Sequence, residues 1–182
     1  MTKKNLAIDL AKSFGYLEED EVVFLQTVAS LLPANPKIVN IGAGAGTSGL
    51  ASVEERPDAT VYTIDISPGG PLGGLEGERN AFANTGLKHP IQILGESHEV
   101  AKNWKNGKVD CIFIDDGHRM REVLGDILYW RTHLKKGGYM IIDDYGSPKW
   151  PAVKKAVDRL LLNRTDYYVH YFIDSVIAFR KR

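Results

Sequence analysis

Hydrophobic residues follow two patterns along the chain, short continuous runs and helical spacings. The runs are bounded by polar or glycine-containing segments, which is typical of strands buried on both faces of a sheet. Between them, apolar residues recur at intervals of three and four, as at Met120, Val123 and Leu124 or at Val153, Ala156 and Val157, which predicts amphipathic helices. The predicted strands cover residues 38–41, 61–64, 91–94, 109–114, 139–142, 167–173 and 176–180.

The order of these elements predicts an α/β fold. Strands separated by helices indicate a parallel sheet built from right-handed βαβ units. The last two runs are joined only by Asp174 and Ser175, which is too short for a parallel crossover, so the final strand should run antiparallel. We therefore expect a three-layer sandwich with a seven-stranded, mostly parallel sheet and an antiparallel C-terminal hairpin strand.

Length and composition fit one domain and exclude some partners. The 182 residues contain 23 Lys and Arg and 23 Asp and Glu, so the formal net charge is zero. This argues against a large basic face for nucleic acid. The longest apolar run has four residues, too few to span a bilayer, and the single cysteine, Cys111, fits a reducing compartment. We expect a cytoplasmic single domain over 1–182, with N-terminal helices in 1–36 and a core over 37–182, and no nucleic-acid or membrane partner.

A glycine-rich segment follows the first predicted strand. Gly44, Gly46 and Gly49 satisfy the dinucleotide-binding pattern G-x-G-x-x-G, whereas Gly42, Gly44 and Gly46 satisfy G-x-G-x-G. The second register places its first glycine directly after the strand and is preferred. Asp65 ends the second strand, where its carboxylate can accept hydrogen bonds from the ribose hydroxyls of either cofactor. A second glycine-rich segment, 67–78, is predicted to be a loop.

These motifs resemble those of a known family. The sequence VNIGAGAG at 39–46 resembles motif I of the class I S-adenosylmethionine-dependent methyltransferases, and YTID at 62–65 resembles their ribose-binding strand. The family has a seven-stranded Rossmann-like fold with an antiparallel terminal hairpin. LGES at 94–97 resembles its adenine-binding segment, although Ser97 can instead cap a helix. The resemblance implies that S-adenosylmethionine is bound by Asn40, Gly42, Gly44, Gly46, Thr47, Asp65, Ile66, Gly95, Glu96, Ser97 and Asp115. The family usually has an acidic residue where Asn40 stands.

Acidic residues end the fourth and fifth predicted strands. Asp115 and Asp116 follow the fourth strand, and Asp143 and Asp144 follow the fifth. Neighbouring parallel strands end at the same edge of a sheet, so these carboxylates should converge and raise one another's pKa values. A hard divalent cation would relieve the repulsion, and carboxylate oxygens suit Mg²⁺. Asp116 with Gly117 can equally form a simple turn.

The pairing of IFID with GGYMIIDDY resembles the metal-dependent O-methyltransferases, most closely the macrocin O-methyltransferase group, which acts on sugar hydroxyls. By position, the resemblance implies that Asp115, Asp143 and Asp144 hold Mg²⁺. Coordination would lower the pKa of an acceptor hydroxyl, and His118 or a free carboxylate would take its proton. His118 and Asp115 are therefore the candidate catalytic residues, although His118 can also be an exposed residue at a helix start.

The leading hypothesis is a Mg²⁺-assisted O-methyltransferase that acts on a hydroxyl of a small molecule or sugar. One alternative is an NAD-dependent oxidoreductase, based on the other glycine register. Another is a non-catalytic cofactor-binding protein of the same fold. Because little of the chain lies outside the core, we expect the N-terminal 32 residues, the 67–78 segment or a partner subunit of a homo-oligomer to complete the acceptor pocket. Otherwise the pocket stays open to a large acceptor.

Overall fold

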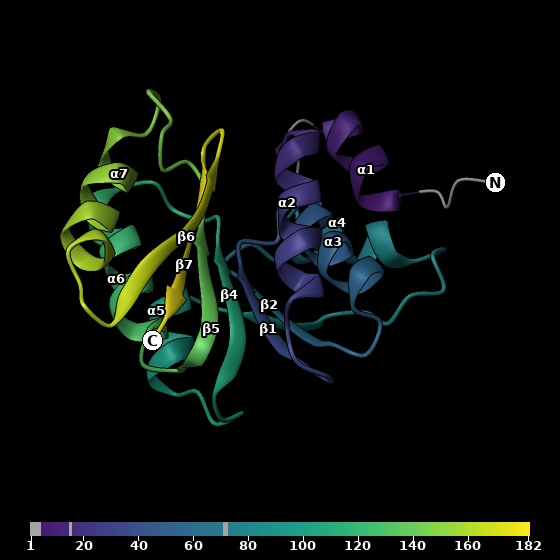
Figure 1. The fold of residues 1–182 in the computed structure, drawn as a ribbon. Coiled ribbons are helices and arrows are strands. Elements are labelled where there is room, and N and C mark those ends of the chain that lie inside the picture. Colours follow the sequence, from purple (N-terminus) through teal and green to yellow (C-terminus); the bar gives the residue numbers. More distant parts are fainter. Residues whose placement is uncertain (1–4, 15, 71–72) are drawn as a thin grey trace.

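The computed structural model describes residues 5–14, 16–70 and 73–182, which form one seven-stranded sheet between two layers of helices (Figure 1). The strand order is β3-β2-β1-β4-β5-β7-β6. The strands are β1 (Lys37–Ile41), β2 (Thr60–Asp65), β3 (Ile91–Leu94), β4 (Val109–Ile114), β5 (Leu134–Ile142), β6 (Tyr167–Ile173) and β7 (Val176–Lys181). Strands β1 to β5 pair in parallel, whereas β7 pairs antiparallel with both β5 and β6. The predicted three-layer Rossmann-like fold with its antiparallel hairpin is confirmed.

Helices cover both faces of the sheet. The helices are α1 (Leu6–Phe14), α2 (Glu19–Ser30), α3 (Thr47–Glu55), α4 (Gly74–Phe82), α5 (Ser97–Lys102), α6 (Met120–Trp130) and α7 (Pro151–Val157), the last followed by a π-helical turn, Asp158–Leu162. Helices α1 to α4 lie on one face and α5 to α7 on the other (Figure 1). Within the described residues, no helix is long and apolar enough to cross a membrane.

Alternate residues of the central strands face opposite helix layers. In β4, Ile112 and Ile114 belong to the core on the α5–α7 side, whereas Cys111 and Phe113 belong to the core on the α1–α4 side. Because both layers exclude water, every residue of this strand is buried. This explains why the strand is a nearly continuous apolar run in the sequence.

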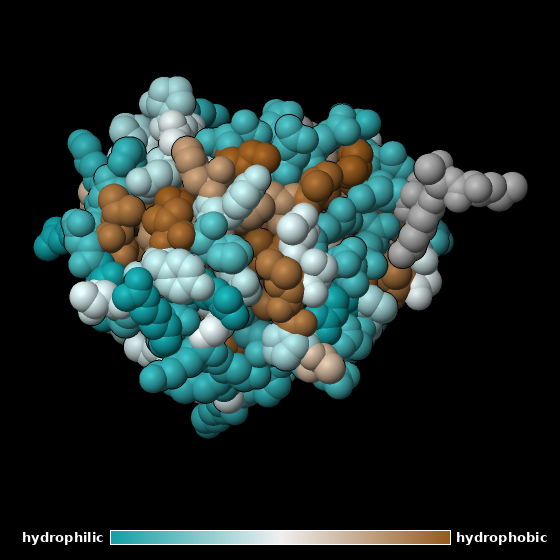
Figure 2. Space-filling model, viewed as in Figure 1, coloured by the Kyte–Doolittle hydropathy of each residue, from teal (hydrophilic) through white to brown (hydrophobic). Residues whose placement is uncertain are grey.

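The edge strand β6 is exposed along most of its length. Val169, Tyr171 and Phe172 are each exposed, and Figure 2 shows several hydrophobic patches on this face, within a mostly hydrophilic surface. The pairing of β6 with β7 shifts register between Val169 and Tyr171. A bulge of this kind twists an edge strand and disfavours pairing with other chains.

The segment 67–78 is only partly the loop that its glycines predict. Helix α4 begins at Gly74, inside that segment, and positions 71 and 72 lie outside the described residues. Gly73 has a φ of +95°, and a Cβ there would lie 2.1 Å from the carbonyl oxygen of Gly44. The glycine at position 73 therefore permits close contact with the first glycine-rich segment, rather than simply marking a flexible connection.

Asp126 of α6 is a buried carboxylate at the contact with α5. It is 4% exposed and forms a hydrogen bond with the Ser97 side chain, whose Oγ also accepts a 2.8 Å hydrogen bond from Trp130 Nε1. Burial raises the pKa of Asp126 from 3.8 to about 7, and the nearby carboxylates of Asp116 and Glu122 act in the same direction.

Replacing Asp126 with Asn should stabilise the protein at neutral and alkaline pH. The raised pKa means that the folded state keeps a proton that the unfolded state loses. The stability contributed by this proton is therefore complete below about pH 4 and is lost as the pH rises to about 7. The shift corresponds to at most about 4 kcal/mol. The free energy of unfolding of Asp126→Asn, measured by urea denaturation, should exceed that of the wild type increasingly from pH 4 to pH 8. A difference that is constant over this range would contradict the assignment.

Candidate active site

The loop between β1 and α3 has the backbone conformation that its glycines allow. Gly42, Gly44 and Gly46 all have positive φ, at +93°, +49° and +96°, whereas Gly49 lies within helix α3. The three residues that require glycine are therefore those of the preferred register, G-x-G-x-G. A Cβ at Gly42 would lie 1.9 Å from the carbonyl oxygen of Asp115, so the loop passes directly over the end of β4.

Asp65 holds this loop from the end of β2. Its Oδ2 accepts a 2.8 Å hydrogen bond from the backbone N–H of Ala43, and its Oδ1 accepts one of 2.7 Å from that of Ser67. The carboxylate is 9% exposed and lines the same cleft as Gly42 and Gly44. Each oxygen keeps a further lone pair, so Asp65 can brace the loop and still accept hydrogen bonds from a ligand.

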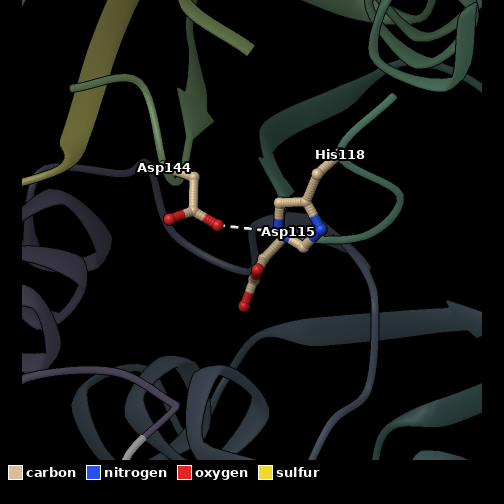
Figure 3. Close-up of side chains that lie close together, drawn as sticks. All are labelled: Asp115, His118 and Asp144. Carbon is tan, nitrogen blue, oxygen red and sulfur yellow. Dashed lines mark ion pairs between the residues drawn. The ribbon is translucent and has the colours of Figure 1, made fainter. Parts of the chain in front are cut away.

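Asp115, His118 and Asp144 converge at the ends of β4 and β5. Each offers a potential ligand atom, and these atoms lie within 4.8 Å of one another (Figure 3). His118 Nε2 lies 2.6 Å from Asp144 Oδ2. The pKa of Asp115 is raised well above its usual value, first by burial and then by the charges of Asp143 and Asp144. The predicted convergence of acidic strand ends is present.

Asp143 is close to this group but engaged elsewhere. Its Oδ1 accepts a 2.8 Å hydrogen bond from the backbone N–H of Asp144 and lies 3.3 Å from Ser175 Oγ. Burial and the neighbouring Glu21 raise its pKa to about 7. Asp143 is not part of the group within 4.8 Å, in which His118 stands instead. The ligand set expected from the family, Asp115, Asp143 and Asp144, therefore differs from the set that the side chains form. Asp144 has a φ of +57°, which turns the chain sharply between the two aspartates.

One cleft of about 710 Å³ joins the glycine loop to the acidic group. It is bounded by Gly42 and Gly44 on one side and by Asp115, His118 and Asp144 on the other. Asp116 also lines it, and burial and the charge of Asp65 raise the pKa of Asp116 to about 6.

Several cleft residues were not indicated by any sequence motif. Tyr16 and Glu18 precede α2, Glu21 belongs to its first turn, and Ser175 lies between β6 and β7. Trp150, which follows the acidic residues after β5, also lines the cleft and stacks on His118 with ring centroids 4.3 Å apart. Tyr16, Glu18, Glu21 and Ser175 come from the two ends of the chain, so no local pattern links them to the glycine loop.

Asn40 points away from the cleft. It lies on β1 with both neighbours buried, and its side chain lines a small internal cavity with Ser48 and Ser52 beneath α2 and α3. Neither polar atom of its amide has a hydrogen-bond partner among the described residues. Thr47, also expected near the cofactor, is 3% exposed and does not line the cleft.

The expected adenine-binding residues are divided between two environments. Glu96 is exposed and Gly95 half-buried beside a neighbouring hollow, and Ile66 is 54% exposed. Ser97 is 3% exposed, and its hydroxyl is engaged with Trp130 and Asp126. Ser97 is also not the helix cap, because α5 is preceded by Glu96 as N-cap.

Comparison with known proteins identifies the family. Residues 39–145 match the family model of a methyltransferase domain, which covers more than half of the chain. The chain therefore belongs to this methyltransferase family, and the predicted class of S-adenosylmethionine-dependent methyltransferases is confirmed rather than an oxidoreductase.

Individual relatives are more distant. Protein R132 of Acanthamoeba polyphaga mimivirus is 35% identical over an alignment of 142 residues. The match covers 62% of this chain and 63% of that protein, so the chain spans less than two thirds of this relative. A Corynebacterium glutamicum protein of solved structure has a TM-score of 0.81 at 16% identity, covering 100% of this chain and 91% of its own. The Podospora anserina methyltransferase PaMTH1, solved with S-adenosylhomocysteine, has a TM-score of 0.76 at 19% identity, with 99% and 89% covered. An O-methyltransferase from Bacillus cereus, also solved with S-adenosylhomocysteine, has a TM-score of 0.77 at 15% identity, with 100% and 93% covered. These likenesses show the fold.

Replacing Gly42 with Ala should destabilise the protein by about 3 kcal/mol, because a strained φ adds to overlap with the backbone of β4. Gly86→Ala is the matched control, since Gly86 has a φ of +70° with nothing within 4 Å of the added Cβ. It should cost only about 1 kcal/mol of strain. Equal losses in the two variants, measured by urea denaturation, would show that the loop does not need its close approach to Asp115.

Proposed function

We propose that this methyltransferase transfers the methyl group of S-adenosylmethionine to a hydroxyl oxygen of a small molecule or sugar, assisted by Mg²⁺. The observation that carries the proposal is the single cleft that contains both the glycine loop with Asp65 and the group of Asp115, His118 and Asp144. The first part fits a nucleoside cofactor, and the second fits activation of an oxygen nucleophile. A cleft of about 710 Å³ is within the range of small-molecule sites.

The cofactor would lie across the glycine loop. Gly42 and Gly44 leave no side chain between the backbone and the cleft, and the free lone pairs of Asp65 suit the two ribose hydroxyls. Glu96 and Gly95, at the end of β3, are the proposed adenine neighbours, and Ile66 provides an exposed apolar side chain beside Asp65. Asn40, Thr47 and Ser97, which are buried away from the cleft, are not included.

The donor set fits a hard divalent cation. Asp115 and Asp144 offer carboxylate oxygens, which Mg²⁺ prefers, and two close carboxylates without a counter-charge repel each other. The imidazole nitrogen of His118 suits Mg²⁺ less well than it suits transition metals. We therefore assign Asp115 and Asp144 as the metal ligands, with Asp143 behind them, and His118 as the general base.

The remaining chemistry is alignment and proton removal. The bound cofactor supplies an activated methyl group, and the cation would lower the pKa of the acceptor hydroxyl. His118 Nδ1, the ring nitrogen that is not paired with Asp144, takes the hydroxyl proton as the new oxygen–carbon bond forms and the carbon–sulfur bond breaks. Asp144 Oδ2, 2.6 Å from the other ring nitrogen, Nε2, stabilises the imidazolium, and Trp150 holds the ring by stacking. The acceptor would lie between Trp150 and the wall formed by Tyr16 and Glu18.

S-adenosylhomocysteine should raise the melting temperature by about 5–10 °C at 100 times its Kd, because it binds only the folded state. Asp65→Ala should remove most of this shift while the protein remains folded by circular dichroism. NAD⁺ serves as the control nucleotide and should give no comparable shift. A wild-type protein whose melting temperature does not respond to S-adenosylhomocysteine would contradict the cofactor assignment.

Asp144→Asn should weaken Mg²⁺ binding more than tenfold, because it removes one of two charged oxygen ligands. Its affinity for S-adenosylhomocysteine should stay within about twofold, since the loop and Asp65 are untouched. Asp20→Asn, an exposed change on α2 outside the cleft, is the control and should bind Mg²⁺ normally. Calorimetric titration of Mg²⁺ into each variant, with S-adenosylhomocysteine present, measures the Mg²⁺ affinity, and titration of S-adenosylhomocysteine measures the cofactor affinity. Unchanged Mg²⁺ affinity in Asp144→Asn would show that Asp144 is not a metal ligand and would contradict the proposed site.

A further inference from the structure

Glu21 is a buried carboxylate behind the acidic group, contributed by the N-terminal helix α2. It is 4% exposed and lines the cleft. One oxygen, Oε2, accepts a 2.9 Å hydrogen bond from the backbone N–H of Glu18 and thereby caps the helix. The other, Oε1, accepts a 2.7 Å hydrogen bond from Ser175 Oγ, 154 residues away in the chain. Capping alone needs only the first contact.

Ser175 connects Glu21 to Asp143. Its Oγ lies 3.3 Å from Asp143 Oδ1, and its backbone carbonyl accepts a 2.8 Å hydrogen bond from the N–H of Tyr145. The turn between β6 and β7 is therefore fastened both to α2 and to the residues that follow β5. Asp143 in turn accepts the backbone N–H of Asp144 at 2.8 Å. A continuous path of contacts leads from Glu21 through Ser175 and Asp143 to Asp144.

The Glu21 carboxylate has no ion-pair partner in the part of the chain that the structure describes. Its charge instead acts on two other carboxylates, Asp143 and Asp115. Burying a carboxylate beside like charges is unfavourable unless a cation compensates for it.

We propose that Glu21 is a positioning residue for the metal site: through Ser175 it fixes the Asp143 carboxylate and the Asp143–Asp144 turn, and its charge strengthens cation binding at Asp115 and Asp144. The inference rests on the proposed Mg²⁺ site and adds α2 to the elements that build it. Outer residues that orient or polarise metal ligands typically change metal affinity by about 10–100-fold when they are replaced.

The test compares Glu21→Gln with Glu19→Gln, the same chemical change two residues earlier on the exposed side of α2, where Glu19 pairs with Lys12. Gln retains an oxygen that can accept the Glu18 N–H, so the helix cap survives. Titration calorimetry with MgCl2 and S-adenosylhomocysteine should give about tenfold weaker Mg²⁺ binding for Glu21→Gln and wild-type binding for Glu19→Gln. The affinity of Glu21→Gln for S-adenosylhomocysteine and its melting temperature without metal should not fall, which a merely structural role would not predict.

Ser175→Ala provides the second measurement, because it breaks the connection and leaves the charge of Glu21 in place. Mg²⁺ binding should weaken by about threefold or more, and kcat for methyl transfer should fall without a change in the KM for S-adenosylmethionine. Normal Mg²⁺ affinity in Glu21→Gln, with Asp144→Asn defective, would overturn the role of Glu21 while the proposed function stands. Normal affinity in Ser175→Ala would overturn the positioning path. A wild-type protein that does not bind Mg²⁺ would overturn the metal site itself and this inference with it.

Discussion

The register of the parallel strands determines which residues meet at the active edge of the sheet, the edge at which β1, β4 and β5 end. The hydrogen-bond ladder continues one residue past each strand, so that Gly42 N–H bonds to Ile64 O at 2.9 Å, Asp115 N–H to Ile41 O at 2.9 Å, and Asp143 N–H to the carbonyl of residue 114 at 3.0 Å. The chain therefore leaves β1, β4 and β5 at one common level. Gly42 must lack a side chain because it leaves β1 against the carbonyl of Asp115. Because the strands end at this common level, the acidic residues that follow β4 and β5 lie beside a ligand bound on the glycine loop.

This arrangement concentrates unfavourable interactions in one place. Burial and the charges of nearby carboxylates raise the pKa values of Asp115, Asp116 and Asp143, and Asp144 adopts a left-handed backbone conformation. Such features persist only where the surrounding structure imposes them, and they cluster at functional sites. Here the imposing structure is a sheet buried on both faces and fastened at the active edge by the β6–β7 turn. A bound cation would compensate the negative charges of these carboxylates, which would then bind it as ligands. This compensation links the fold to the proposed function.

Much of the fold was predictable because buried strands and amphipathic helices leave distinct patterns. Strand β5 begins at Leu134, earlier than predicted. The prediction missed its first residues because Lys135 and Lys136 are exposed and interrupt the apolar pattern. Asp115 and Asp144 were predictable from topology alone, since they end neighbouring strands. The sequence predicted Asp143 together with them, and it did not show that the side chain of His118 would lie closer to Asp115 and Asp144 than that of Asp143 does.

Other parts of the site depend on contacts that no local pattern records. Asn40 shares the face of Ile38, which points into the α1–α4 layer, so strand alternation places it away from the cofactor despite its position in the motif. Ser97 turns inward because Trp130, on a different helix, needs an acceptor for its indole N–H. Glu21, Tyr16 and Ser175 reach the cleft from the chain ends, and only the folded chain brings them there. The N-terminal segment was one of the parts expected to complete the acceptor pocket, and Tyr16, Glu18 and Glu21 of that segment line the cleft.

The most direct test is a crystal structure with S-adenosylhomocysteine and Mn²⁺, whose anomalous scattering locates the metal in place of Mg²⁺. Our account predicts the nucleoside on the glycine loop with its ribose at Asp65, and one anomalous peak coordinated by Asp115 and Asp144. Cofactor density on the loop without a peak between these carboxylates, or with a peak elsewhere, would contradict metal-assisted methyl transfer at this edge of the sheet.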